Sequence, residues 1–348
     1  MRAQLLTHAL RASAVEVDVV TTSPEGVVFL AQFGIDATLL STHYAVQFDA
    51  CQNMLRVATD ANVAGYLFRP SRMMRDVVRL SRMMRRADLI INDSFHPALL
   101  FMGWFPTTRR KVVHVYGDSL RHALETNFAG RWPRWLAMLF GRVVSWQIDA
   151  SCARLEHDFP LPTTPMRGRN TYRLPTPVAL VAATAKQGGG AAVYLNPHFR
   201  DPQLAHALER GFALAGIAAT LTGEGYAQRP GWAAQDADWV SRAAASDLIV
   251  SAPGMAALAV ALVYQRPILL VLTEQPEQRI NAARAAELDL LHRTVVWRGD
   301  AEGFAAEVRD ACRQLVASEP SRDRGDGHAA ASARLQRWLA VIVALARQ

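Results

Sequence analysis

The groups best suited to chemistry lie between residues 247 and 283, starting with a candidate anion site. The apolar run Asp247–Ser251 is followed by Ala-Pro-Gly, and an apolar stretch of helix length begins at Met255. Glycine lets a ligand approach the backbone closely, and the first N–H groups of a helix attract a phosphate. We therefore expect Ser251 and the N–H groups of Gly254 and Met255 to bind a diphosphate.

Polar side chains follow the next apolar run, at residues 268–272. They are Glu274, Gln275, Glu277, Gln278 and Asn281, the last two being three residues apart and so on one helical face. Amide side chains donate and accept hydrogen bonds, as contact with a sugar hydroxyl requires. The stretch is a candidate sugar site, although an ordinary crossover with a solvated first turn would have the same pattern.

The elements that must position these groups are typical of buried parallel sheets. Short apolar runs suit strands that are covered on both faces, and they alternate with helical segments in both halves of the chain. The expected strands are 15–20, 36–40, 87–92 and 111–115, then 191–195, 217–221, 247–251, 268–272 and 294–297. The pattern predicts an α/β protein with two Rossmann-like domains and a cleft between them.

The domain boundaries follow from composition. Residues 1–160 are the expected N-terminal, acceptor-binding domain, and the proline- and glycine-containing segment 161–190 is the expected linker. Residues 191–328 are the expected nucleotide-sugar domain, and residues 329–348 a C-terminal helix that packs back on a domain.

Further candidates follow the predicted strands, where ligands bind in open α/β sheets. His96 and Asp118 stand there in the first half and are candidates for a general base, which would be a histidine or an aspartate. Asn196 and Gly223 stand there in the second half. A structural role stays open for each ionisable group.

The chain opens on a helix, whereas a doubly wound domain normally opens on a strand in the middle of its sheet. Loss of that strand would leave two unpaired sheet edges inside the domain. We therefore expect Met1 to be an internal methionine or the gene to be truncated, with a domain of one strand fewer as the alternative.

Composition bounds the partners and the location. A net charge of +7 and a pI of ≈ 9.8 indicate an anionic partner. No recognised nucleic-acid module is present, so nucleic acid is not an expected partner. The three cysteines are far apart, which favours a reducing compartment. We find no signal peptide and no run of membrane-spanning length, and expect a cytoplasmic protein.

Two segments suggest the inner face of a membrane. Residues 69–86 predict a basic amphipathic helix, and residues 128–148 combine tryptophans and phenylalanines with arginines. Both features are typical of peripheral membrane contact. A helix packed on a sheet with a solvated arginine face is the alternative for the first, and an interdomain contact for the second.

These features together resemble the GT-B glycosyltransferases. The second half is most similar to the lipid-intermediate N-acetylglucosaminyltransferases of peptidoglycan synthesis, a family 28-like group. The resemblance implies that Gly254 and Met255 meet the diphosphate of the donor and that Glu277, Gln278 and Asn281 hold its sugar. Val260 is a departure, because the family has an acidic ribose ligand there. The family's glycine-rich loop with its base histidine would precede Met1.

The resemblance implies a metal-independent glycosyltransferase without a cofactor. It would move a sugar from a nucleoside diphosphate, foremost a UDP-sugar, to an unknown acceptor, for which a membrane lipid is one candidate. Two alternatives stay open. One is a nucleotide-sugar epimerase using Glu224, Glu274 and His198. The other is a non-catalytic homologue that has kept the fold.

Overall fold

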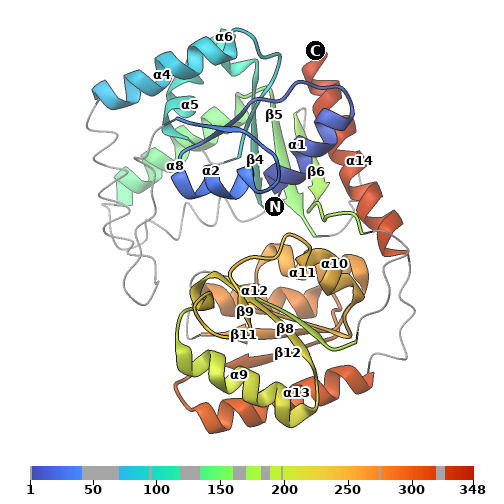
Figure 1. Ribbon diagram of the computed structural model, residues 1–348. Helices are drawn as coiled ribbons and strands as arrows, with labels where there is room; N and C mark the ends of the chain where they lie inside the picture. The colour runs from blue at the N-terminus through green and yellow to red at the C-terminus, as the bar shows by residue number, and fades with distance from the viewer. Residues whose placement is uncertain are drawn as a thin grey trace. The chain divides into compact units, whose positions relative to one another are not determined.

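The computed structural model describes residues 2–40, 70–93, 96–117, 134–159, 170–181, 189–196, 199–273, 276–318 and 326–348. They belong to two compact units (Figure 1). Unit 1 joins the residues up to Thr176, apart from a short segment outside the described residues, with Arg334–Gln348. Unit 2 contains Pro177–Ala333.

Unit 2 contains a six-stranded parallel sheet in the order β12-β11-β10-β7-β8-β9. Its strands are β7 (Ala191–Leu195), β8 (Ala219–Gly223), β9 (Trp232–Ala233), β10 (Leu248–Ser251), β11 (Ile268–Leu272) and β12 (His292–Val296). Every side chain of β10 and β11 is buried, as their unbroken apolar runs predict.

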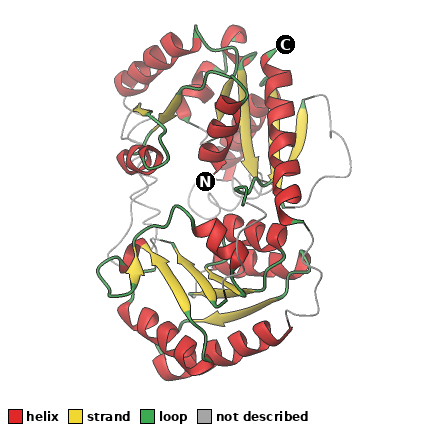
Figure 2. Cartoon of the chain, turned by 45° about the vertical axis from the view of Figure 1, so that its right-hand side comes forward, coloured by secondary structure: helices red, strands yellow, loops and turns green. Residues whose placement is uncertain are grey.

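Helices cover both faces of this sheet (Figures 1 and 2). One layer holds α9 (Pro202–Ala215) and α13 (Ala301–Ser318), and the other holds α10 (Trp239–Ala245), α11 (Met255–Tyr264) and α12 (Pro276–Glu287). A short 3-10 turn, η1, spans Glu224–Tyr226. Alternate side chains of the strands, such as Val193 and Leu195, pack with Leu208 of α9 and Val308 of α13 in one hydrophobic cluster.

Unit 1 contains two parallel sheets instead of one. The first pairs β1 (Val19–Thr21) with β2 (Ala37–Leu39), and the second has the order β3 (Ile90–Asn92), β4 (Val112–Gly117), β5 (Ala153–Asp158), β6 (Thr171–Pro175). Val20 of β1 and Ile90 of β3 nevertheless pack against the same hydrophobic cluster. In the described part of the chain the strands of this unit thus form two separate sheets.

The helices of unit 1 are α1 (Arg2–Ala12), α2 (Pro24–Ala31), α4 (Pro70–Met84), α5 (Pro97–Met102), α6 (Pro106–Arg109) and α8 (Arg134–Asp149). The last helix of the chain, α14 (Gly327–Ala346), also contributes to this unit. Leu335, Trp338 and Ile342 of α14 share a core with Leu6 of α1 and Leu155 of β5.

Two expectations need correction. Strand β6 lies inside the predicted linker, and Trp338 Nε1 donates to the carbonyl oxygen of its Pro175 at 2.7 Å. The linker prediction is therefore wrong for residues 171–175, because a proline at the end of an edge strand disturbs no hydrogen-bond ladder.

The second correction concerns the expectation that no run reaches membrane-spanning length. Helix α14 is long and apolar enough to cross a membrane, with a mean hydropathy of 1.3. Trp338, fully buried, places it in a core.

Candidate functional site

The donor-side candidates gather at the carboxyl ends of adjacent strands in unit 2. β7 lies between β8 and β10, so the strand order reverses there, which is where open α/β sheets bind ligands. Ser251 ends β10, and its hydroxyl donates to the carbonyl oxygen of Tyr194 at 2.9 Å. Ser251 is only 2% exposed, so its side chain ties β7 to β10. Asn196, partly exposed, follows β7 at the same edge.

The N-terminus of α11 stands beside Ser251 without a side-chain cap. Gly254 is its N-cap residue, with φ −106° and ψ 150°, a conformation that needs no glycine. A Cβ added at Gly254 would find the carbonyl oxygen of Ala252 at 3.9 Å as its nearest neighbour. Among the described residues, the space beside Gly254 is therefore open, and no side chain competes with an anion for the first N–H groups of α11. The N–H of Gly254 itself donates to the carbonyl oxygen of Ala252 at 2.7 Å, so the N–H groups from Met255 onward are the ones left for a diphosphate.

Gln278 lies at the carboxyl end of the neighbouring strand, β11. Its Oε1 accepts from the backbone N–H of Thr273 at 2.6 Å and from the Thr273 hydroxyl at 3.1 Å. These bonds fix the side chain. Because Oε1 accepts both of them, the Nε2 group is left to donate a hydrogen bond to a sugar hydroxyl. Asn281, partly exposed, follows one turn later on α12.

Three other residues predicted for the sugar site lie wholly or partly outside the described residues. Glu277 lies in the first turn of α12, but its side chain is outside the described part. Glu274 and Gln275 lie outside the described residues, as does His198. The structure therefore brings Ser251, Gly254, Met255, Gln278 and Asn281 to adjacent strand ends, since Ser251 is in register with Leu270 of β11.

Packing accounts for Gly223 without a ligand. An added Cβ would lie 3.1 Å from the ring of Trp232 and 3.2 Å from that of Tyr226. The geometry therefore gives no support for a place of this glycine in the donor site. The preceding Thr222 is a residue that the sequence interpretation missed: it is 1% exposed, and its hydroxyl has no hydrogen-bond partner among the described residues. Such buried groups call for an explanation, and ligand binding is one.

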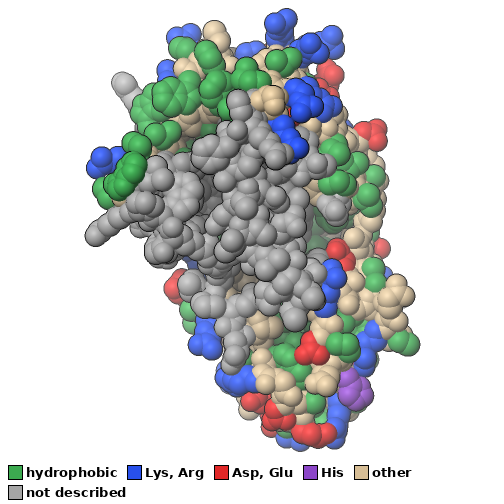
Figure 3. All heavy atoms as spheres, turned by 90° about the vertical axis from the view of Figure 1, so that its left-hand side faces the viewer, with side chains coloured by type: hydrophobic (Ala, Val, Ile, Leu, Met, Phe, Trp, Pro, Cys, Tyr) green, Lys and Arg blue, Asp and Glu red, His purple; other side chains and the backbone are tan. Residues whose placement is uncertain are grey.

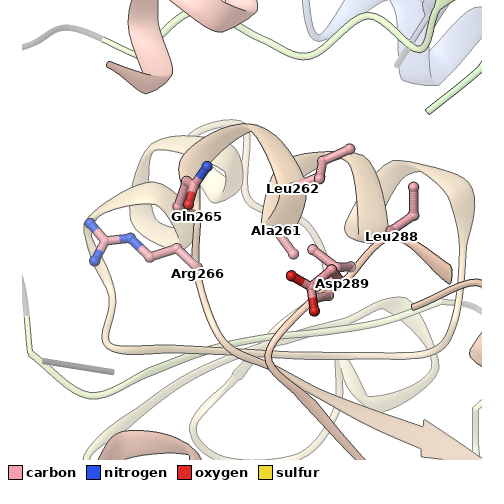
Figure 4. A pocket seen from close by; sticks show the side chains of 7 residues that line it. Ala261, Leu262, Gln265, Arg266, Leu288 and Asp289 are labelled. Atoms are coloured by element: carbon pink, nitrogen blue, oxygen red, sulfur yellow. The ribbon is translucent and has the colours of Figure 1, made fainter. Parts of the chain in front are cut away.

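The position at which the resemblance to the peptidoglycan N-acetylglucosaminyltransferases would place a ribose-binding acid is not accessible to a ligand in this chain. Val260 is fully buried in α11. A cavity of ≈ 300 Å³ does exist nearby, but it lies at the amino ends of the strands, between the ends of α11 and α12 (Figure 4). Its lining residues are Ala261, Leu262, Gln265, Arg266, Leu288, Asp289 and Leu290. Because ligands of such sheets bind at the carboxyl ends, this cavity is not the candidate site.

In unit 1, the predicted base His96 has a structural task. It caps α5: its Nδ1 accepts from the N–H of Ala98 at 3.2 Å. Its own N–H donates to Oδ1 of Asn92 at 3.3 Å. Asn92 also contacts Nδ1 of His114 at 3.2 Å, and burial lowers the pKa of His114 to about 4. Asp118, the other predicted base, lies outside the described residues.

A second histidine at this sheet edge was not predicted. His157 lies near the carboxyl end of β5, in register with Gly117 of β4. Burial lowers its pKa to about 4, and the charge of Arg2 acts in the same direction. His157 is therefore neutral at pH 7, and the same burial makes its ring a weaker proton acceptor than an exposed histidine. Arg2 forms an ion pair with Asp93, which follows β3. In the described residues no group of three or more His, Cys, Asp or Glu could hold a metal ion.

No family model matches the sequence, and no curated protein matches it. Solved structures do. The calicheamicin glycosyltransferase CalG4 is 15% identical with a TM-score of 0.62, over 99% of this chain and 94% of that chain. LpCGTa in complex with UDP is 15% identical with a TM-score of 0.57, and the glycosyltransferase VinC in complex with dTDP is 16% identical with a TM-score of 0.54. Both matches cover 99% of this chain and 95% of the other.

At these identities the likeness establishes the fold. The chain has the GT-B fold of two Rossmann-like domains, as the sequence predicts. The closer resemblance to the peptidoglycan N-acetylglucosaminyltransferases stays a prediction, since none of these structures tests it.

Proposed function

We propose that this protein is a glycosyltransferase that moves a sugar from a nucleoside diphosphate sugar to an acceptor. The observation that carries the proposal is the uncapped N-terminus of α11 at Gly254, with open space in front of it and Gln278 on the neighbouring strand end. The likeness in fold to glycosyltransferases that bind UDP and dTDP supports it.

In the proposed reaction the diphosphate of the donor lies at the first N–H groups of α11. The positive end of the helix stabilises the charge that develops on the diphosphate as the glycosidic bond to it breaks. This stabilisation comes from the backbone and assigns no role to a metal. Gln278 and Asn281 hold the hydroxyls of the sugar. We take a UDP-sugar as the first donor to test.

Unit 1 binds the acceptor and supplies the base in this proposal. The base removes a proton from the acceptor hydroxyl as its oxygen bonds to the sugar carbon. His96 and Asp118 remain the candidates from the sequence, and His157, which lies near the carboxyl end of β5, joins them by its position. A lipid-linked acceptor at the inner face of a membrane is the more specific form of the proposal.

Calorimetric titration with UDP, GDP and dTDP tests the donor site. We expect binding of at least one nucleotide to the unaltered chain and its loss in Gly254→Trp, because the indole would fill the space in front of α11. Leu214→Trp is the matched control, since Leu214 is an exposed residue near the end of α9, away from this edge. Equal affinities in the unaltered chain and in Gly254→Trp would refute the placement.

A product assay then separates the two enzymatic interpretations. The chain is incubated with labelled nucleotide sugar, with and without added acceptors, and the products are resolved. Sugar transferred to an acceptor supports the proposal. Conversion of the nucleotide sugar to its epimer without any acceptor would instead establish the epimerase alternative.

A further inference from the structure

Unit 1 carries an unusual concentration of exposed apolar side chains. Twelve large hydrophobic residues are exposed in the described part of the chain, and nine of them lie between residues 74 and 146. Among these nine the largest exposures are those of Trp135 (67%) and Trp104 (55%), with Phe105 and Leu139 close behind. Apolar surface gathered in this way is unfavourable in water and marks an interaction site.

On α8 these side chains form one stripe. Met138, Leu139 and Trp146 follow Trp135 by three, four and eleven residues, and the four side chains therefore share a helical face. The opposite face is buried through Val144 and Ile148. Three members of the stripe, with Arg142, line a hollow of ≈ 620 Å³.

The stripe continues onto α5 and the turn that follows it. Gln147 of α8 donates to the carbonyl oxygen of Leu100 of α5, which holds the two helices together. The rings of Trp104 and Trp146 lie 5.4 Å apart, and the guanidinium of Arg109 lies 5.7 Å from the Trp146 ring. We call the exposed apolar residues of α4, α5, the 103–105 turn and α8 the apolar surface.

Arginines border the apolar surface. Helix α4 packs on α5 through Val77, Leu80 and Met84, so that its other face is exposed. Across α4, α6 and α8 the arginines whose side chains are described are Arg72, Arg75, Arg79, Arg82, Arg109 and Arg142. The same helices carry two aspartates: Asp76 is buried, and Asp149 pairs with Arg154. Figure 3 faces this side and shows a broad hydrophobic area with Lys and Arg side chains beside it.

We propose that the apolar surface and its arginines dock on an anionic lipid surface. Tryptophan and phenylalanine rings favour the boundary between headgroups and acyl chains, and each arginine near anionic headgroups adds roughly 1 kcal/mol. The rival occupant is a second copy of this chain. That arrangement would bring the arginine-rich borders of two copies together, and like charges oppose it, whereas an anionic membrane complements them.

Flotation with lipid vesicles in the absence of nucleotide tests this proposal separately from the donor site. We expect the chain to float with vesicles of phosphatidylcholine containing about a third phosphatidylglycerol, and less so as salt screens the arginines. Binding to pure phosphatidylcholine should be weaker by roughly tenfold or more. Equal binding to both vesicles, without dependence on salt, would overturn the assignment of an anionic partner.

Substitutions locate the surface. Trp135→Ser combined with Leu139→Ser should weaken flotation by at least about tenfold, because two exposed apolar side chains no longer insert. Leu214→Ser, which removes an exposed leucine from unit 2, should leave flotation unchanged. Circular dichroism confirms that each variant is folded. Unchanged flotation of the double variant would refute the surface, and a dimer in light scattering that the double variant abolishes, without flotation, would assign it to a second copy.

Discussion

At the scale of single residues, Gly254 and Gln278 divide the proposed donor between them. Gly254 faces the space assigned to the diphosphate, and Gln278, held by Thr273, faces the space assigned to the sugar. The two residues should therefore respond differently to a nucleotide and to the corresponding nucleotide sugar.

Gln278→Ala should weaken binding of the nucleotide sugar by roughly fivefold to tenfold, the worth of one lost hydrogen bond, and leave binding of the free nucleotide nearly unchanged. Calorimetry with both ligands measures this difference. Glu287→Ala, which removes an exposed polar side chain from the same helix, is the control. Equal loss for both ligands would mean that Gln278 supports the fold of the site and does not hold the sugar.

His114 gives unit 1 a defined dependence on pH. Its folded-state pKa of about 4 lies below the ordinary value of 6.5, so the unfolded chain binds the proton more tightly. Stability is therefore retained above pH 6.5 and lost as the pH falls toward 4. Between pH 7 and pH 4.5, urea unfolding should show His114→Gln losing roughly 2 to 3 kcal/mol less than the unaltered chain. Equal losses of stability in both proteins would contradict the assignment. The pKa of His157 is lowered in the same way, but its contribution cancels because this residue is present in both proteins.

Sequence alone separates such residues poorly. Gly223 and Gly254 both follow a predicted strand. Trp232 and Tyr226 fill the space beside Gly223, whereas among the described residues the space beside Gly254 is open. These partners follow Gly223 by only three and nine residues, but their positions in space depend on the turn between β8 and β9, which spacing alone does not reveal. His96 similarly stands where a base would, but its ring caps a helix that begins one residue later. Residue types thus predicted which residues reach the carboxyl edges of the sheets, and packing decides which of them are open to a ligand.

At the scale of elements, unbroken apolar runs were reliable guides. Strands β7 and β11 and helix α11 have the bounds that their composition predicts. Strands β5 and β6 were missed. In β5, Arg154, Glu156 and His157 interrupt the apolar pattern, because alternate side chains are only partly buried. Strand β6 was assigned to the linker because of its prolines, and proline content alone cannot distinguish an edge strand from a linker.

Two helical glycines provide a test of packing between elements. Gly211 of α9 lies against α13: an added Cβ would be 2.5 Å from Cγ1 of Val308. Gly141 of α8 has nothing within 4 Å of that position. Gly211→Ala should therefore destabilise the protein by about 1 to 3 kcal/mol through overpacking. Gly141→Ala should stabilise it by up to about 1 kcal/mol through helix propensity.

Chemical unfolding of the two variants measures both signs, and each serves as the control for the other. If Gly211→Ala proved stabilising, α9 and α13 would not be as closely packed as the structure has them. The result would then also question the hydrophobic cluster that these helices share.

At the scale of the whole molecule, the two units differ in the continuity of their sheets. Among the residues that the structure describes, unit 2 has six strands in one sheet, while unit 1 has its strands in sheets of two and four. A strand edge without a partner strand exposes backbone groups to water, so its amides exchange readily. We expect hydrogen exchange to be slowest in β10 and β11 and much faster in β1, β2 and β3.

Nucleotide should act on one unit only. A ligand bound to unit 2 at 100 times its dissociation constant stabilises that unit by about 2.7 kcal/mol. In exchange experiments the protection of β10 and β11 should therefore rise with UDP or the best-bound nucleotide, while that of β3 and β4 stays constant. Protection gained in unit 1 alone would refute the proposal that the nucleotide binds to unit 2.

The contribution of α14 to unit 1 has a consequence for how the protein is made. Unit 2 contains one continuous stretch, Pro177–Ala333, whereas the core of unit 1 includes Trp338 and Ile342, which the ribosome adds after that stretch. Synthesis therefore delivers every strand of unit 2 before it delivers the helix that closes unit 1. The unit whose strands come first along the chain is thus the last that can complete its core, and until then Leu6, Leu155 and their neighbours lack the helix that buries them.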